Sequence, residues 1–99
     1  MSHLFRYNAA PDSATVGTSS SVVLAGNADR KGVIFVNDSA NKIYLAINRA
    51  AVSGKGILLT ANGGAYEINR TNLTKQAVSA IATGAGSELT ILEAEEDVK

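Results

Sequence analysis

The sequence predicts an all-β protein, a compact antiparallel β-sandwich of the jelly-roll or immunoglobulin-like type with an extended N-terminal arm. Three observations support this prediction. Short runs of β-branched and aromatic residues recur along the 99-residue chain. Turn-forming Asn, Asp, Ser and Gly separate these runs about every 8 to 12 residues, which is typical of sandwiches. No helix of normal length is indicated by the apolar pattern.

A chain of this length forms one domain. We expect an extended arm over residues 1–13, a sandwich over 14–93 and an acidic tail over 94–99. The arm contains aromatic residues and the single proline, and it either pairs with a neighbour or folds back on its own domain. Clustered like charges over 93–97 favour a solvated, frayed terminus over an acidic docking tail.

Several runs of strand-forming residues follow the arm. They are residues 14–16, 19–25, 33–36, 43–47, 57–60, 65–68, 77–82 and 88–92. The first two make one strand or a bulged pair around Gly17. Residues 33–36 are apolar without a break, which predicts a central strand buried on both faces. Residues 43–47 alternate, which predicts one better-buried face.

The connections in the second half are equally marked. Residues 48–56 form the longest expected loop, and such loops often carry interaction residues. Asn62 and Gly63 tolerate positive φ, so they predict a hairpin or a tight corner. The last two runs are expected to pair with each other around the turn at 83–87.

Composition excludes several classes of protein. Nine basic and nine acidic residues give no net charge, so nothing favours nucleic acid or an anionic membrane as a partner. The absence of Cys excludes disulfides and thiolate metal sites. No apolar run approaches the roughly 20 residues that span a membrane. The first ten residues lack the apolar core of a signal peptide, so residence in a cytoplasm is expected.

Catalytic motifs are missing as well. The single histidine, His3, has no neighbour that would make it a metal ligand or a general base. The segment Gly54-Lys55-Gly56 lacks the upstream glycine of a phosphate-binding loop, because Arg49 stands at that spacing. We therefore expect no enzyme, no cofactor and no metal.

Five segments resemble small virion proteins of tailed bacteriophages. In that group a basic "R-K" precedes an "I-x-N" strand, as in Ala28–Asn37, and a "Y-V/L-A" strand follows, as in Ile43–Ile47. A "G-I-x-L-x-x-G-G-x-Y-E" block is similar to Gly56–Ile68. A "V-x-A-I-A" strand and a terminal "L-T-I/V-x-E" strand are similar to Val78–Gly84 and Leu89–Glu93. The resemblance covers roughly residues 20 to 93.

This resemblance implies a structural role on the virion. It suggests a head decoration or cement protein that binds the major capsid protein and stabilises the head, with a tail or fibre accessory protein as the nearest alternative. The expected location is the capsid surface, after assembly in the host cytoplasm. A thin core also favours a homo-oligomer, for which capsid symmetry suggests a trimer.

Candidate contact residues come from the aromatic arm and the long loop. They are Leu4, Phe5, Arg6 and Tyr7 as partner-binding residues, with Arg49 and Lys55 as rim charges. Each also has an ordinary explanation, because aromatic residues fill cores and surface charges maintain solubility.

A carbohydrate-binding host-recognition module is the rival function. Such a module stacks an exposed aromatic ring on a sugar beside hydrogen-bonding Asn or Asp residues. Tyr44 and Tyr66 are the available platforms, and the chain has no Trp.

Overall fold

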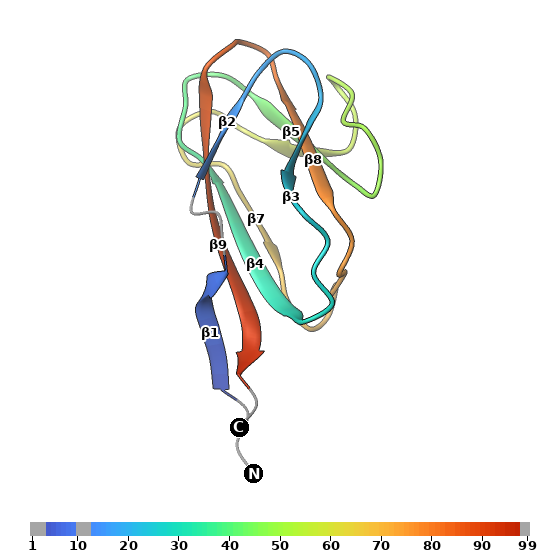
Figure 1. Ribbon diagram of the computed structural model, residues 1–99. Coiled ribbons are helices and arrows are strands. Elements are labelled where there is room, and N and C mark those ends of the chain that lie inside the picture. Colours follow the sequence, from blue (N-terminus) through green and yellow to red (C-terminus); the bar gives the residue numbers. More distant parts are fainter. Residues whose placement is uncertain (1–3, 10–12, 98–99) are drawn as a thin grey trace.

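A computed structural model describes residues 4–9 and 13–97, with side chains for residues 13–95. The described residues form nine β-strands in two antiparallel sheets that pack face to face (Figure 1). They contain no helix, and the predicted all-β class is confirmed. The strands are β1 (Leu4–Ala9), β2 (Ser13–Val16), β3 (Ser21–Leu24), β4 (Arg30–Asn37), β5 (Ile43–Ile47), β6 (Ile57–Leu59), β7 (Ala65–Ile68), β8 (Val78–Ala82) and β9 (Ser87–Asp97).

The two sheets share the strands in an interleaved order. Sheet A has the order β1-β9-β4-β7, and β2 also pairs with β9. Sheet B has the order β3-β8-β5-β6. The predicted pairing of 77–82 with 88–92 is wrong, because β8 lies in sheet B and β9 in sheet A. Asn62 and Gly63, at φ 60° and 118°, form a corner between β6 and β7, which also lie in different sheets.

The core lies between the sheets and follows the period of two along each strand. Ile43 and Leu45 of β5 are buried, as the alternation predicts. The expected burial of β4 on both faces is wrong: Val33 and Phe35 are buried, but Ile34 is 37% exposed. No third layer within the described residues covers the outer side of sheet A, so only one side of β4 is packed.

The acidic C-terminal stretch is a strand and not the expected frayed terminus. The strand β9 runs as far as Asp97, with β4 on one side and β1 on the other. Leu89, Ile91 and Glu93 alternate on its inner side and are all buried. Pairing on both sides supplies the backbone hydrogen bonds that a free terminus would leave to water.

A buried arginine closes one end of the sandwich. The Nε of Arg30 lies 2.6 Å from Oε2 of Glu93, and both side chains are almost wholly excluded from solvent. The guanidinium also donates to the carbonyl oxygens of Ala25 at 2.7 Å, Thr74 at 3.1 Å and Gln76 at 2.8 Å. One side chain thus joins β4 and β9 to the β3–β4 and β7–β8 connections.

A buried asparagine has the same role at the other end of β4. The Nδ2 of Asn37 lies within hydrogen-bonding distance of the carbonyl oxygens of Asn41 at 2.7 Å, Leu59 at 3.1 Å and Thr60 at 3.1 Å. Its Oδ1 accepts a hydrogen bond from the hydroxyl of Ser39 at 2.7 Å. Among the described residues, every buried side-chain nitrogen or oxygen has a hydrogen-bond partner. The connections at both ends are therefore fixed by satisfied polar contacts.

Removal of the Glu93 carboxylate should destabilise the fold strongly. Glu93→Ala leaves the Arg30 charge buried without its counter-ion, so we expect a loss of about 3 to 5 kcal/mol in the free energy of unfolding. The control is Glu67→Ala on an exposed position of β7, where a change within about 0.5 kcal/mol is expected. Urea unfolding of both variants measures this difference, and equal stabilities would contradict the structural role of the pair.

Candidate functional site

The described residues were searched for groups that could bind a metal ion. They contain no group of three or more His, Cys, Asp and Glu residues that could hold a metal ion. Within the same residues, no helix is long and apolar enough to cross a membrane. The buried Arg30–Glu93 pair is engaged with backbone carbonyls and has no access to a ligand. The outer surfaces of the two sheets carry large apolar side chains that are exposed.

The outer side of sheet B is rich in apolar residues. We call it face B and define it by the outward side chains of β3, β8, β5 and β6, which are Val22, Tyr44, Ala46, Leu58, Ser79 and Ile81. Tyr44 lies opposite Ile81 on one neighbouring strand and opposite Leu58 on the other. Val22 is 63% exposed and Leu58 45% exposed. These side chains form an apolar band that crosses the sheet.

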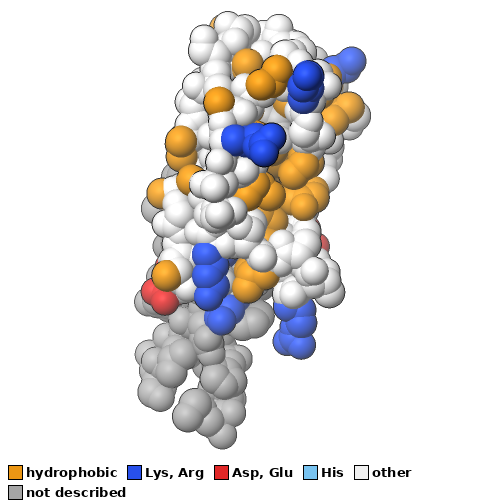
Figure 2. All heavy atoms as spheres, turned by 90° about the vertical axis from the view of Figure 1, so that its right-hand side faces the viewer, with side chains coloured by type: hydrophobic (Ala, Val, Ile, Leu, Met, Phe, Trp, Pro, Cys, Tyr) orange, Lys and Arg blue, Asp and Glu red, His pale blue; other side chains and the backbone are white. Residues whose placement is uncertain are grey.

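The chain segment that contains β5 and β6 of face B carries cations and no acidic residue. The four strands of sheet B, all of them described, contain no acidic residue. Between Asp38 and Glu67 the chain carries Lys42, Arg49 and Lys55, all exposed, and no acidic residue. Figure 2 shows this side of the molecule, with hydrophobic side chains along its middle and Lys and Arg side chains beside them. An apolar centre with a cationic rim matches a partner with an acidic rim.

The β5–β6 loop extends this surface. Asn48 adopts a left-handed conformation, with φ 59°, directly after β5. The backbone N–H of Ala51 then donates to the hydroxyl of Ser20 at 2.8 Å, which ties the loop to the start of β3. Ala51 is buried although it lies outside the main core. A groove of about 440 Å³ separates the loop from β3 and β8, and its lining includes Val22 and Arg49.

The backbone at the end of the β5–β6 loop lies so close to β5 that it requires glycine at position 56. Gly56 has a φ of 86°, and a Cβ atom there would lie 2.5 Å from the carbonyl oxygen of Leu45. Any side chain at Gly56 would therefore push β6 away from β5. The loop is held at both ends, by Ser20 and by this contact.

The structure separates the two groups of residues that the sequence singles out. Arg49 and Lys55 both lie exposed on the β5–β6 loop. Leu4 to Tyr7 lie in β1, which pairs with the end of β9, and their side chains are outside the described residues. Figure 1 shows β1 at the opposite end of the molecule from this loop. The arm and the loop therefore do not form a single site.

Tyr66 and Tyr44 differ in their availability. Tyr66 packs against the core, and its hydroxyl accepts a hydrogen bond from Nδ2 of Asn72 at 3.1 Å. Tyr44 points outward on face B. One of the two predicted sugar platforms is thus occupied by the fold itself, which leaves the carbohydrate-binding alternative with a single aromatic ring.

Sequence reasoning did not find the exposed apolar residues of face B. Leu58 stands in the uninterrupted run Ile57-Leu58-Leu59, where the sequence shows apolar side chains on both faces and does not say which face is covered. Val22 stands before a shift in register between β3 and β8, so both Val23 and Leu24 face inward. The one feature of the sequence that could have indicated face B is the absence of acidic residues from 39 to 66.

Comparisons with known proteins give no match: no protein-family model fits the chain, and no curated protein or solved structure is similar to it at the threshold of significance.

Loss of the Ser20 hydroxyl should release the β5–β6 loop. Ser20→Ala removes the acceptor for the Ala51 N–H, so we expect faster hydrogen exchange at Ala51 and about 1 kcal/mol lower stability. Ser21→Ala, on the exposed first residue of β3, is the control and should leave both quantities unchanged. Amide exchange followed by NMR measures the effect, and unaltered protection of Ala51 in Ser20→Ala would show that the bond does not hold the loop.

Proposed function

We propose that the chain is a structural protein of a bacteriophage virion, a capsid decoration protein that binds the major capsid protein on the head surface. The observation that carries this proposal is face B, an exposed apolar band with a cationic rim on a two-sheet sandwich. A decoration protein needs a stable platform and a docking surface, and it needs no chemistry. The resemblance of residues 20–93 to tailed-phage virion proteins supports the same function.

Face B suits a protein surface better than a nucleic acid. Val22 and Leu58 are large apolar side chains, and covering them with a matching apolar surface lowers the free energy. Nucleic-acid binding uses stacked aromatic side chains and dense positive charge. Face B has one aromatic residue, Tyr44, and the whole chain has no net charge. An acidic rim on the capsid protein would complement Lys42, Arg49 and Lys55.

Stabilisation of a shell follows from selective binding. A protein that binds the assembled capsid and not the free subunits lowers the free energy of the assembled state alone. The gain rises with the free concentration of the decoration protein relative to its dissociation constant. Exposed rim charges such as Arg49 and Lys55 would mainly speed the encounter, whereas the apolar band would hold the complex.

Co-sedimentation tests the proposal directly. Purified protein is mixed with assembled heads of the phage that encodes it and, separately, with unassembled major capsid protein. We expect the protein to sediment with the heads and to raise their resistance to heat. Absence of binding to both forms would overturn the proposed function.

Leu58→Glu should weaken the binding to heads by at least about tenfold, because it places a carboxylate inside the apolar band. Leu92→Glu is the matched control, since Leu92 is a leucine of similar exposure on sheet A, 43% against 45%. The ratio of bound to free protein across a concentration series measures both effects. Equal weakening by the two variants would exclude face B as the specific docking surface.

A further inference from the structure

The outer side of sheet A carries a second exposed apolar patch. We call it face A and define it by the outward side chains of β9, β4 and β7, which are Ile34, Val36, Ala65, Leu92 and Ala94, of which Ala94 is only 3% exposed. Ile34 pairs in register with Leu92, and the two are 37% and 43% exposed. No described residue covers them as a third layer.

A hollow of about 180 Å³ lies in this face. Its floor is formed where Gly32 and Ala94 are neighbours across β4 and β9. A Cβ atom at Gly32 would lie 3.0 Å from the carbonyl oxygen of Ile68, so a larger residue there would require β7 to shift by a few tenths of an ångström. The hollow has several times the roughly 30 Å³ that one water molecule occupies, so it has room for the end of an aliphatic side chain.

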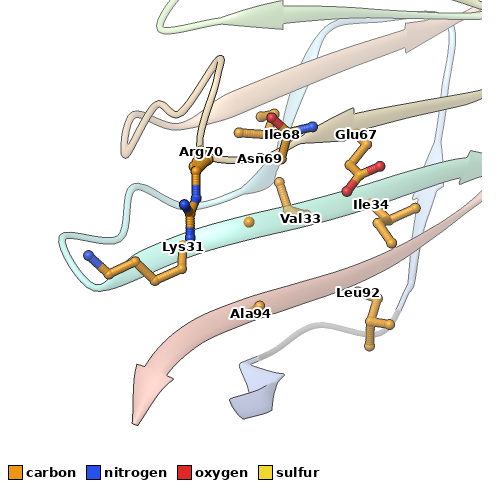
Figure 3. Close-up of a pocket in the computed structure, with 10 residues that line it drawn as sticks. Lys31, Val33, Ile34, Glu67, Ile68, Asn69, Arg70, Leu92 and Ala94 are labelled. Atoms are coloured by element: carbon orange, nitrogen blue, oxygen red, sulfur yellow. The ribbon is translucent and has the colours of Figure 1, made fainter. Parts of the chain in front are cut away.

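The lining of the hollow has two unlike halves. One half carries the large apolar residues Ile34 and Leu92 together with the carboxylate of Glu67, which lies opposite Ile34 on β7. The other half carries small residues and the cations Lys31 and Arg70. Figure 3 shows Lys31 and Arg70 at one end and Glu67, Ile34 and Leu92 at the other. The half with large apolar side chains and a carboxylate is therefore complementary in shape and charge to the half with small side chains and cations.

We propose that a second copy of this chain occupies face A and is related to the first copy by a two-fold axis. The axis lies in the plane of the interface, perpendicular to the strands, and passes between the two halves of the hollow. This axis places each strand against the same strand of the other copy, with its direction reversed. Leu92 then lies over Ala94 of the second copy, and Ile34 over Gly32. Glu67 meets Arg70 of the second copy, and the same contacts occur twice because the interface is isologous.

A copy of the same chain fits this face better than a foreign partner does. The complementary halves lie side by side on one surface, which is the arrangement that a two-fold dimer needs. Face B lacks that property, because residues 39–66, which include β5 and β6, carry cations and no acidic residue. Aligned packing of two sheets face to face is also a common way to bury their outward apolar side chains.

The size of face A sets the expected strength. Strands lie about 4.8 Å apart and rise about 3.3 Å per residue, so three strands along the eight residues of β4 span at most roughly 14 Å by 26 Å, and β7 covers only four residues of that length. A stable specific interface buries about 800 Å² on each partner. Face A is smaller, so the dimer forms and dissociates with concentration. This inference does not depend on the proposed virion function, because its tests need only the purified chain.

Matched leucine variants test the surface. Sedimentation velocity of the wild type from low micromolar to millimolar concentration should show a monomer of 10.2 kDa in equilibrium with a dimer. Leu92→Glu should raise the dissociation constant by at least about tenfold. Leu58→Glu, at similar exposure on face B, should dimerise like the wild type.

Charge exchange tests the orientation of the two copies. Glu67→Arg and Arg70→Glu should each weaken the dimer, since each variant places like charges opposite one another in both symmetry-related contacts. A mixture of the two variants should form a heterodimer, because each Glu67 or Arg70 position then again faces the opposite charge. The doubly substituted chain should also recover self-association. Circular dichroism of each exposed-site variant verifies that the fold is retained.

Three results would overturn the proposed dimer, and a fourth would overturn its two-fold arrangement. The first is a wild type that stays monomeric at millimolar concentration. The second is a trimer or larger assembly. The third is equal loss of association in Leu92→Glu and Leu58→Glu, which would show that the copies do not meet through face A. Failure of the charge-exchanged mixture to associate, with both single variants weakened, would exclude the proposed two-fold arrangement.

Discussion

The burial of one guanidinium group determines how the strands of sheet A are aligned. The guanidinium group of Arg30 is fully buried, so its N–H donors need a carboxylate and several carbonyl oxygens around them. Glu93 supplies the carboxylate from the inner side of β9. A slip of one residue between β4 and β9 would turn Glu93 outward and leave Arg30 unpaired. The same register that pairs these charges places Leu92 beside Ile34 and Ala94 beside Gly32 on the outer side. Face A is therefore fixed by an interaction on the opposite side of the sheet.

A two-layer sandwich of this size buries one side of each sheet and leaves the other to solvent or to partners. Exposed apolar residues on those outer sides contribute little burial to the stability of the described fold. Val22, Ile34, Leu58 and Leu92 are such residues. Their presence on both sheets indicates two docking surfaces. The surrounding charges distinguish them, because residues 39–66 around β5 and β6 of face B carry cations and no acidic residue, whereas the hollow of face A has both signs.

Local patterns predicted most strands but not their partners. The alternation in 43–47, the loop at 48–56 and the turn at Asn62-Gly63 depend on neighbouring residues, and the structure confirms them. Whether β8 pairs with β9, or which side of β4 is covered, depends on contacts between distant segments. The acidic stretch at 93–97 was misjudged for the same reason, since its charges suggested repulsion and the buried Arg30 was not foreseen.

The candidate surfaces were less predictable than the strands. Arg49 and Lys55 were visible because the loop that carries them is long, and loops tend to expose charge. The apolar halves of both faces were hidden in runs such as 33–36, where inward and outward residues are equally apolar. Only the strand order shows which of them lack cover, and that order is a property of the whole chain.

The opposite orientation of the two faces constrains how they can act together. A dimer through face A would carry its two copies of face B on opposite sides, because each face B lies on the far side of its own sandwich. Two opposed surfaces cannot both rest on one flat region of a shell, so pairing would add no avidity for a single shell. One copy of such a dimer could dock through its face B without any change in the affinity of the dimer contact. The second copy would then present an unoccupied face B to a further surface. A chain with this geometry is suited to joining two surfaces when it is concentrated and to covering one when it is dilute.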